Sequence, residues 1–275
     1  MIDSMKIGNK VFDFKHHTYV MGILNVTPDS FSDGGKWNQL DAAKKCAEQM
    51  IKDGVDIIDV GGESTRPGYE RVSDEEEIKR VVPVIQALKE EFDIPVSIDT
   101  YKSAVARAAT WMGVDLINDI WGLKADDEMA RVVKRSNTCV CLMHNRENME
   151  YKNFMYDVKN DLKKSIDIAK KAGISDEKII IDPGVGFAKT LEMNLAIMNQ
   201  LEAFHDLGYP ILLGASRKSV IGLTLNLPVD EREEGTLATT ALAVTKGCQF
   251  VRVHNVKGNK RFIKMLEAIR NAKVD

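Results

Sequence analysis

Short apolar runs alternate along this chain with stretches whose apolar residues have helical spacing. The first run, residues 19–24, is bounded by polar residues and predicts a short buried strand. Residues 41–53 follow with helical spacing and stop at Gly54, a typical helix end. The next apolar run, residues 55–60, precedes a capping box at residues 73–76 that predicts the start of a second helix.

The same alternation continues to the C-terminus. Further strands are predicted at residues 96–98, 116–117, 139–143, 179–181, 211–213 and 250–253, and further helices at 102–112, 126–134, 156–172, 192–206, 234–245 and 259–272. Strands that alternate with helices are typical of parallel βαβ units. Eight such units in about 250 residues predict an α/β fold, a (β/α)8 TIM barrel.

A doubly wound open sheet is the alternative fold. It needs no eighth strand, and a glycine-rich fingerprint usually marks its beginning. The G-x-G pattern of this chain, Gly184 to Gly186, comes late and lacks the third glycine, so it is weak support for a dinucleotide site. The barrel is therefore favoured.

The N-terminus is predicted to be a small extension of the barrel. Residues 5–14 alternate in polarity around Gly8-Asn9, a pair typical of hairpin turns. The chain has 275 residues, 44% hydrophobic and 29% charged, which is an ordinary globular composition and enough for one large α/β domain. We interpret residues 1–275 as a single domain in which residues 1–18 form an N-terminal β-hairpin extension.

Charge and cysteine usage argue against several classes of protein. A net charge of -3 argues against a nucleic-acid-binding protein, which needs a basic surface. The four cysteines have no C-x-x-C spacing, which argues against a zinc site or a disulfide framework, and Cys139 and Cys141 are expected to pack in the core. No signal peptide and no long uncharged apolar segment occurs, so we expect a cytoplasmic protein that does not enter a membrane.

Polar side chains follow the C-terminal ends of nearly all the predicted strands. In chain order they are Asn25, Thr65, Arg66, Asp99, Asn118, His144 (after Met143), Asp182, Lys218, Ser219, Arg252 and His254. The C-terminal ends of all strands of a parallel barrel converge on one mouth. Each residue alone could be a helix cap or a satisfied polar group. Together they predict an active site.

Two groups of these residues suit two kinds of ligand. The acceptors Asp99, Asn118 and Asp182 suit a flat heterocycle rich in N–H donors, such as a 2-amino-4-oxo pyrimidine ring. Lys218 can donate to the acceptors of that ring, and Arg252 can stack on its face. In the other group, Arg66 and His254 suit an anion such as phosphate, and Asn25 could add a neutral ligand to a hydrated Mg²⁺.

The loop after the first predicted strand also has the composition of a binding loop. Residues 25–35 contain an amide, two carboxylates, two serines and one aromatic side chain. Pro28 and the pair Gly34-Gly35 are incompatible with a continued strand. Loops of this kind next to a buried strand commonly carry function.

Several segments resemble the dihydropteroate synthases. Residues 25–35 and 61–68 match the two signatures of that family. The match extends through the strand ends at residues 98–100, 118–119, 142–145, 182–187, 216–219 and 252–254. It runs from Val20 onward, so the predicted hairpin lies outside it.

The resemblance implies a folate-pathway transferase. Such an enzyme joins 4-aminobenzoate to 6-hydroxymethyl-7,8-dihydropterin pyrophosphate and yields 7,8-dihydropteroate and pyrophosphate, with Mg²⁺ as its cofactor. Sulfonamides are expected to compete at the aminobenzoate site. The family is generally dimeric, so a homodimer is expected.

The resemblance also assigns site residues. The pterin site is Asp99, Asn118, Met143, Asp182, Phe187, Gly214, Lys218 and Arg252. The pyrophosphate site is Asn25, Thr65, Arg66 and His254, with Asn25 as the Mg²⁺ ligand. The aminobenzoate site is Phe31, Thr65, Pro67, Phe187, Lys218 and Ser219. The residues expected to act in catalysis are Asp99, Arg66, His254, Lys218 and Asn25.

The residue types favour a dissociative substitution, because no nucleophile paired with a base is evident. Arg66, His254 and Mg²⁺ would stabilise the departing pyrophosphate, and Asp99 would stabilise the cation left on the pterin methylene. The family usually has Asp where this chain has Asn255. If that side chain orients His254, the amide would weaken stabilisation of the imidazolium.

Three other functions share parts of this pattern. A pterin-dependent methyltransferase domain has the same barrel and pterin pocket but no pyrophosphate for Arg66 and His254 to hold. A non-catalytic pterin-binding paralogue would not need these residues intact. An unrelated phosphate-binding isomerase or aldolase is the third, and an aldolase would need a Schiff-base lysine within a strand, whereas Lys218 follows a strand end.

Overall fold

Eight parallel strands form the barrel. The computed structural model describes residues 2–15, 17–27, 36–63 and 71–274. The strands are β3 (Tyr19–Asn25), β4 (Ile57–Gly61), β5 (Val96–Asp99), β6 (Leu116–Asp119), β7 (Cys139–Met143), β8 (Ile179–Asp182), β9 (Leu212–Leu213) and β10 (Phe250–Val253). They pair in the order β8-β7-β6-β5-β4-β3-β10-β9, and a parallel bridge between Ile181 and Ile211 joins the two edges. The predicted (β/α)8 TIM barrel is confirmed.

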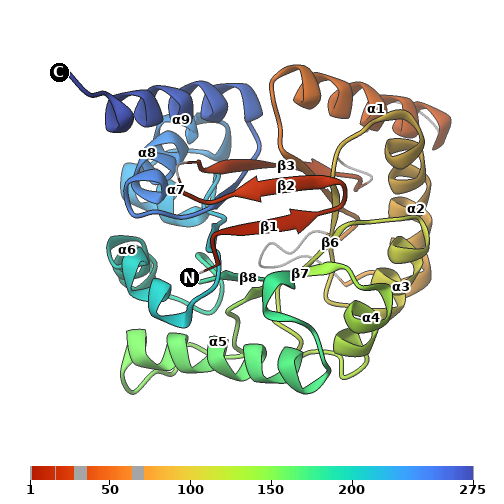
Figure 1. The fold of residues 1–275 in the computed structure, drawn as a ribbon, viewed down its shortest axis with the longest axis horizontal. Coiled ribbons are helices and arrows are strands. Elements are labelled where there is room, and N and C mark those ends of the chain that lie inside the picture. The colour runs from red at the N-terminus through yellow and green to blue at the C-terminus, as the bar shows by residue number, and fades with distance from the viewer. Residues whose placement is uncertain (1, 16, 28–35, 64–70, 275) are drawn as a thin grey trace.

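Helices follow the strands and form a ring around them (Figure 1). They are α1 (Lys36–Lys52), α2 (Asp74–Glu91), α3 (Ser103–Trp111), α4 (Met129–Ser136), α5 (Phe154–Lys171), α6 (Leu191–Asn199), α7 (Ser219–Leu225), α8 (Glu233–Thr245) and α9 (Val256–Asn271). The predicted helix start is confirmed, because Ser73 is the N-cap of α2 and its Oγ accepts the backbone N–H of Glu76 at 3.2 Å.

One predicted helix differs in the structure. The helical pattern of residues 192–206 is divided between α6 and a 3₁₀ helix, η3 (Leu201–Leu207). Leu201 and Phe204 are both fully buried and are three residues apart. That spacing places two side chains on the same face of a 3₁₀ helix, whose turn is three residues.

The predicted N-terminal hairpin covers the N-terminal end of the barrel. Strands β1 (Ser4–Ile7) and β2 (Lys10–Asp13) pair in antiparallel orientation and lie across the barrel strands (Figure 1). The ring of Phe12 packs edge-on against Tyr19 at 4.8 Å between centroids and lies 5.6 Å from Phe250. We call the resulting cluster the barrel floor; it consists of Met5, Ile7, Phe12, Met21, Ile57, Leu116, Cys139, Cys141, Ile180, Leu212 and Phe250.

Two further predictions concern the cysteines and the membrane. Cys139 and Cys141 are buried free thiols in the barrel floor, as their position within an apolar run predicted. In the part of the chain that the structure describes, each helix is too short or too polar to cross a bilayer.

Candidate active site

Polar side chains line the mouth of the barrel, at the opposite end from the barrel floor. Side chains alternate between the two faces of a strand, so every second residue points into the barrel. At the C-terminal ends these inward positions bring Asp59, Asp99, Asn118, Asp182 and Arg252 together from five strands. The sequence predicted all of them except Asp59.

An arginine held between two carboxylates occupies the centre of the mouth. Arg252 Nε donates to Asp59 Oδ2 at 2.6 Å, and Arg252 Nη2 donates to Asp99 Oδ2 at 2.6 Å. Asn118 Nδ2 lies 3.4 Å from Asp99 Oδ1. Both ion pairs use the edge of the guanidinium, which leaves its planar face available for stacking.

The charges in the mouth are largely withdrawn from water. Burial raises the pKa of Asp99 to about 7, Arg252 opposes that rise, and Asp59 adds to it. Burial also raises the pKa of Asp182, and Lys218 opposes it. Perturbed carboxylates of this kind are characteristic of functional sites.

The loop after β8 supplies the other side of the mouth. The backbone N–H of Gly184 donates to Asp182 Oδ1 at 2.7 Å. Lys218 Nζ donates to the carbonyl oxygen of Val185 and lies 4.5 Å from the centroid of the Phe187 ring. Burial lowers the pKa of Lys218 to about 8. The Asp182 carboxyl group, the Lys218 amine and the Phe187 ring thus lie close together at the mouth.

Two further predicted pterin residues lie at the same mouth. Met143 ends β7, is buried, and pairs in register with Asp182. A Cβ atom added to Gly214 would lie 3.6 Å from Asp182 Oδ2 and 3.9 Å from Arg252 Cβ. The structure therefore brings all the residues predicted for the pterin site together.

His254 is oriented by a residue that sequence reasoning did not single out. Ser216 Oγ lies 2.9 Å from His254 Nδ1 and accepts the backbone N–H of His254 at 3.2 Å. The described contact of the Asn255 side chain is with the first turn of α9. Asn255 Oδ1 accepts the backbone N–H of Gly258 at 2.9 Å and caps α9. Asn and Asp are equally good N-caps, so the exchange is conservative there.

His144 was predicted at the mouth, and this prediction is wrong. Its side chain is completely buried, with Nε2 3.3 Å from Asp161 Oδ2 on α5. Met143, the residue before it, points inward, so strand alternation turns His144 outward toward the helices.

The remaining predicted residues are those expected at the pyrophosphate and aminobenzoate sites. Asn25 is the last residue of β3 and pairs in register with Gly61. Ser219 is exposed at the start of α7. The predicted residues Phe31, Thr65, Arg66 and Pro67 lie outside the described residues.

Metal sites built from protein side chains are limited in the described part of the chain. There, no group of three or more His, Cys, Asp or Glu side chains could hold a metal ion.

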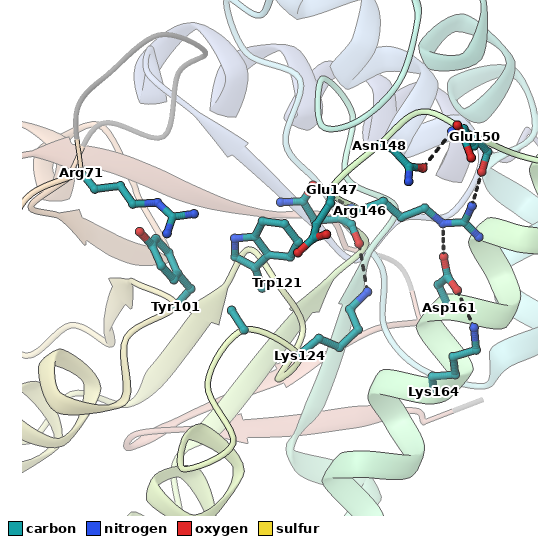
Figure 2. A pocket seen from close by; sticks show the side chains of 12 residues that line it. Arg71, Tyr101, Trp121, Lys124, Arg146, Glu147, Asn148, Glu150, Asp161 and Lys164 are labelled. Carbon is teal, nitrogen blue, oxygen red and sulfur yellow. Dashed lines mark hydrogen bonds and ion pairs between the residues drawn. The ribbon is translucent and has the colours of Figure 1, made fainter.

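A cavity of about 1060 Å³ lies on the same face, along the loops after β5, β6 and β7 (Figure 2). Its charged groups are largely engaged with protein atoms. Arg146 Nε and Lys164 Nζ donate to Asp161 at 2.5 and 3.0 Å, and Lys124 Nζ donates to the carbonyl of Asn145 at 3.0 Å. Among the described residues, none of those predicted for the site lines this cavity.

Comparisons with known proteins agree with this geometry. Residues 21–254 match the family described as pterin binding enzyme. A dihydropteroate synthase of Clostridium beijerinckii is 64% identical over 96% of this chain and 99% of the relative, and one of Bacillus subtilis is 54% identical over 94% and 90%.

Solved structures give the same result. A Clostridium difficile dihydropteroate synthase determined in the presence of pteroic acid has a TM-score of 0.92 and 51% identity. The match covers 95% of this chain and 100% of that one. A Yersinia pestis dihydropteroate synthase in a sulfonamide drug complex has a TM-score of 0.91 and 40% identity, with coverages of 98% and 100%.

Proposed function

The chain belongs to the dihydropteroate synthase family of pterin-binding enzymes, and from that premise we propose the following roles for its residues. It condenses 6-hydroxymethyl-7,8-dihydropterin pyrophosphate with 4-aminobenzoate to give 7,8-dihydropteroate and pyrophosphate. The observation that carries the proposal is the meeting of Asp99, Asn118, Asp182, Lys218 and Arg252 at one barrel mouth.

The pterin ring binds among these groups. Asp99 and Asp182 accept the N–H groups of the ring, and Asn118 can both donate and accept. Lys218 donates to the ring acceptors, and the free face of Arg252 stacks on the ring. Met143, Phe187 and Gly214 complete the walls.

The pyrophosphate binds at the ends of β3, β4 and β10, through Asn25, Thr65, Arg66 and His254. Arg66 and His254 supply charge-assisted hydrogen bonds, and the contact between Ser216 Oγ and His254 Nδ1 orients the imidazole.

Mg²⁺ fits this subsite with Asn25 as its protein ligand. Mg²⁺ commonly combines one or two protein oxygens with phosphate oxygens and water. A Cβ atom at Gly61 would lie 3.4 Å from Asn25 Oδ1, so the absence of a side chain at Gly61 leaves that oxygen accessible. When bound, the ion supplies positive charge that compensates the departing pyrophosphate.

The aminobenzoate binds between the first two loops and the start of α7, through Phe31, Thr65, Pro67, Phe187, Lys218 and Ser219. A sulfonamide, which carries a similar arylamine and an acidic group, competes for the same space.

Catalysis follows a dissociative route. Arg66 and His254 stabilise the charge that develops on the departing pyrophosphate, and the Asp99 carboxylate stabilises the cation on the pterin methylene. The arylamine then attacks that carbon without a strong base. Because Asp99 is paired with Arg252 in the ligand-free protein, its charge is already oriented before substrate binds.

The enzyme is cytoplasmic. It forms a homodimer through helices in the C-terminal part of the chain. Exposed large apolar side chains on α7 and α9 support this: Leu223, Leu225, Met265 and Ile269. Light scattering of the purified protein measures the mass, and a monomer at micromolar concentration would contradict the dimer.

The reaction is tested by measuring the release of pyrophosphate from dihydropterin pyrophosphate. The assay contains Mg²⁺ and is run with and without 4-aminobenzoate. Release that depends on 4-aminobenzoate, yields dihydropteroate and is lost in Arg66→Ala would establish the activity and its anion site. Arg131→Ala on α4 is the control, since the exposed Arg131 pairs with Glu128 and is not among the residues assigned to the site. The cavity lined by Arg71 lies along the neighbouring loops (Figure 2). Tight pterin binding without product would favour the non-catalytic paralogue.

A further inference from the structure

Lys189 is a buried lysine that the proposed reaction does not use. Its side chain is only 8% exposed, and burial lowers the pKa of Lys189 to about 7. Withdrawing an ammonium from water is costly unless its hydrogen-bond donors are satisfied. The role of Lys189 must therefore be sought in the atoms that surround its Nζ.

Three acceptors surround that nitrogen. Lys189 Nζ donates to the carbonyl oxygens of Gly184 and Phe187, each at 2.8 Å, and lies 2.9 Å from His144 Nδ1. An ammonium group has three protons and no acceptor capacity. Every proton of Lys189 therefore has one partner, and none of the three partners is charged.

The neighbours of His144 determine that its Nδ1 accepts. His144 Nε2 lies 3.3 Å from Asp161 Oδ2, and Asp161 also accepts from Arg146 and Lys164 on the wall of the cavity (Figure 2). These donors keep Asp161 a carboxylate, so Nε2 carries the imidazole proton. Burial lowers the pKa of His144 to about 4, so Nδ1 keeps its lone pair for Lys189.

Both carbonyls belong to the loop that forms one wall of the pterin site. In the same loop Gly184 N–H donates to Asp182, and the Val185 carbonyl accepts from Lys218. The loop has left-handed backbone at Gly184 (φ 71°), and a Cβ atom there would lie 2.0 Å from the carbonyl oxygen of His144. It also has φ 47° at Ala188, which is unfavourable for a residue other than glycine. Such a conformation needs contacts that hold it.

We propose that Lys189 is a positioning residue that pins this loop to His144 and thereby holds the pterin-binding groups in place. Resting on the proposed function, this inference adds a residue that touches no substrate. Removing Nζ leaves two buried carbonyls and one imidazole nitrogen without a donor. The loop can then satisfy them only by moving, and Asp182, Phe187 and Lys218 move with it.

The test compares Lys189→Met with the matched control Lys178→Met. Lys178 Nζ also donates to a backbone carbonyl, that of Asn137 at 3.0 Å, but the residue is only half-buried and lies before β8, at the end opposite the mouth. Steady-state kinetics give kcat and the two KM values. Titration calorimetry with dihydropterin pyrophosphate gives its Kd without turnover, and thermal unfolding shows which variants fold.

Lys189→Met is expected to raise the KM and Kd for dihydropterin pyrophosphate on the order of tenfold to a hundredfold. The KM for 4-aminobenzoate should rise by a smaller factor, because only Phe187 and Lys218, of the groups that move with the loop, belong to that site. Lys178→Met should alter none of these values. A folded Lys189→Met protein with unchanged pterin Kd, or with equal rises in both KM values, overturns the proposal. If Lys189→Met does not fold, His144→Phe removes one acceptor and should raise the pterin Kd by a smaller factor; no rise overturns it equally.

The calorimetric arm separates this inference from the proposed function. Wild-type protein that binds dihydropterin pyrophosphate but makes no dihydropteroate refutes the synthase activity. The effect of Lys189→Met on the pterin Kd still decides whether Lys189 positions the loop.

Discussion

The two ends of this barrel are built from the same eight strands and hold opposite kinds of side chain. At the barrel floor, inward positions are apolar, and the hairpin adds Phe12 to the rings of Tyr19 and Phe250. At the mouth, inward positions of the same strands hold Arg252 with its two carboxylates. Only a few residues of each strand separate the two environments.

The difference assigns stability and function to different ends. Burying one large apolar side chain stabilises a fold by roughly 1.5–3 kcal/mol. Burying charges costs free energy that their pairing does not always recover. Asp59 illustrates that cost, because its Oδ1 is buried without a hydrogen-bond partner among the described residues. Apolar burial at the floor stabilises the fold. It offsets the destabilising burial of charges at the mouth, where those charges are held in position for a substrate.

The largest effect is expected from a substitution that creates a cavity in the barrel floor and so lowers stability. Phe12→Ala should reduce the free energy of unfolding by about 3–5 kcal/mol, because the fully buried ring contacts both the hairpin and the barrel. Chemical denaturation measures this loss. At a temperature where the variant is folded, kcat/KM should equal that of the wild type, because the floor lies at the far end from the substrate.

Val11→Ala is the matched control for this prediction. Val11 is the residue before Phe12 on β2 and is 63% exposed, so its truncation should leave stability unchanged. A Phe12→Ala protein of wild-type stability, or one that folds fully but has lost activity, would contradict the separation of the two ends.

A charge removed from the mouth should have the reverse effect. Asp99→Asn is expected to lower kcat by about a hundredfold to a thousandfold, since a preorganised charge acts mainly on the developing cation. The pterin Kd should change much less, because the amide still offers hydrogen bonds to the ring. Single-turnover kinetics and calorimetry measure the two quantities, with Asp13→Asn on the hairpin as the control. Equal losses in kcat and pterin affinity would remove the electrostatic role of Asp99.

The sequence predicted most of the residues that line the mouth, but few of the contacts that hold them in place. Asp99 stands at the end of an apolar run, and polar residues at such ends converge in any parallel barrel. Asp59 lies within its run, so only the pairing of β4 with its neighbours shows how deep it sits. The side of His144 was predictable from strand alternation with Met143, and the cap role of Asn255 from its place before a helix. The contact of Lys189 with two carbonyls depends on a loop conformation that no residue pattern specifies.

A pH dependence of stability follows from His144. Its folded pKa of about 4 lies below the ordinary 6.5, so between these values the unfolded chain binds more protons than the folded one. His144 should therefore contribute a fall of roughly 3 kcal/mol to the free energy of unfolding as the pH drops through that window. The raised pKa of Asp99 acts in the opposite direction there, so the contribution of His144 is the difference between wild type and His144→Gln. Asp161, whose pKa is held below its ordinary 3.8, contributes only below the window. Denaturation at several pH values measures the fall; it should shrink in His144→Gln and persist in the exposed-site control His17→Gln.

The smallest effect is expected at Asn255, the position that departs from the usual family residue. Its Oδ1 accepts from Gly258 N–H at the start of α9, and Ser216 orients His254 instead. Asn255→Asp preserves the cap and adds a charge at the positive end of the helix dipole, a gain of about 0.3–1 kcal/mol. Because the side chain caps the helix, kcat and both KM values should be unchanged. A large rise in kcat in Asn255→Asp would show instead that this side chain acts on His254. Residue 255 would then contribute to catalysis as well as capping α9.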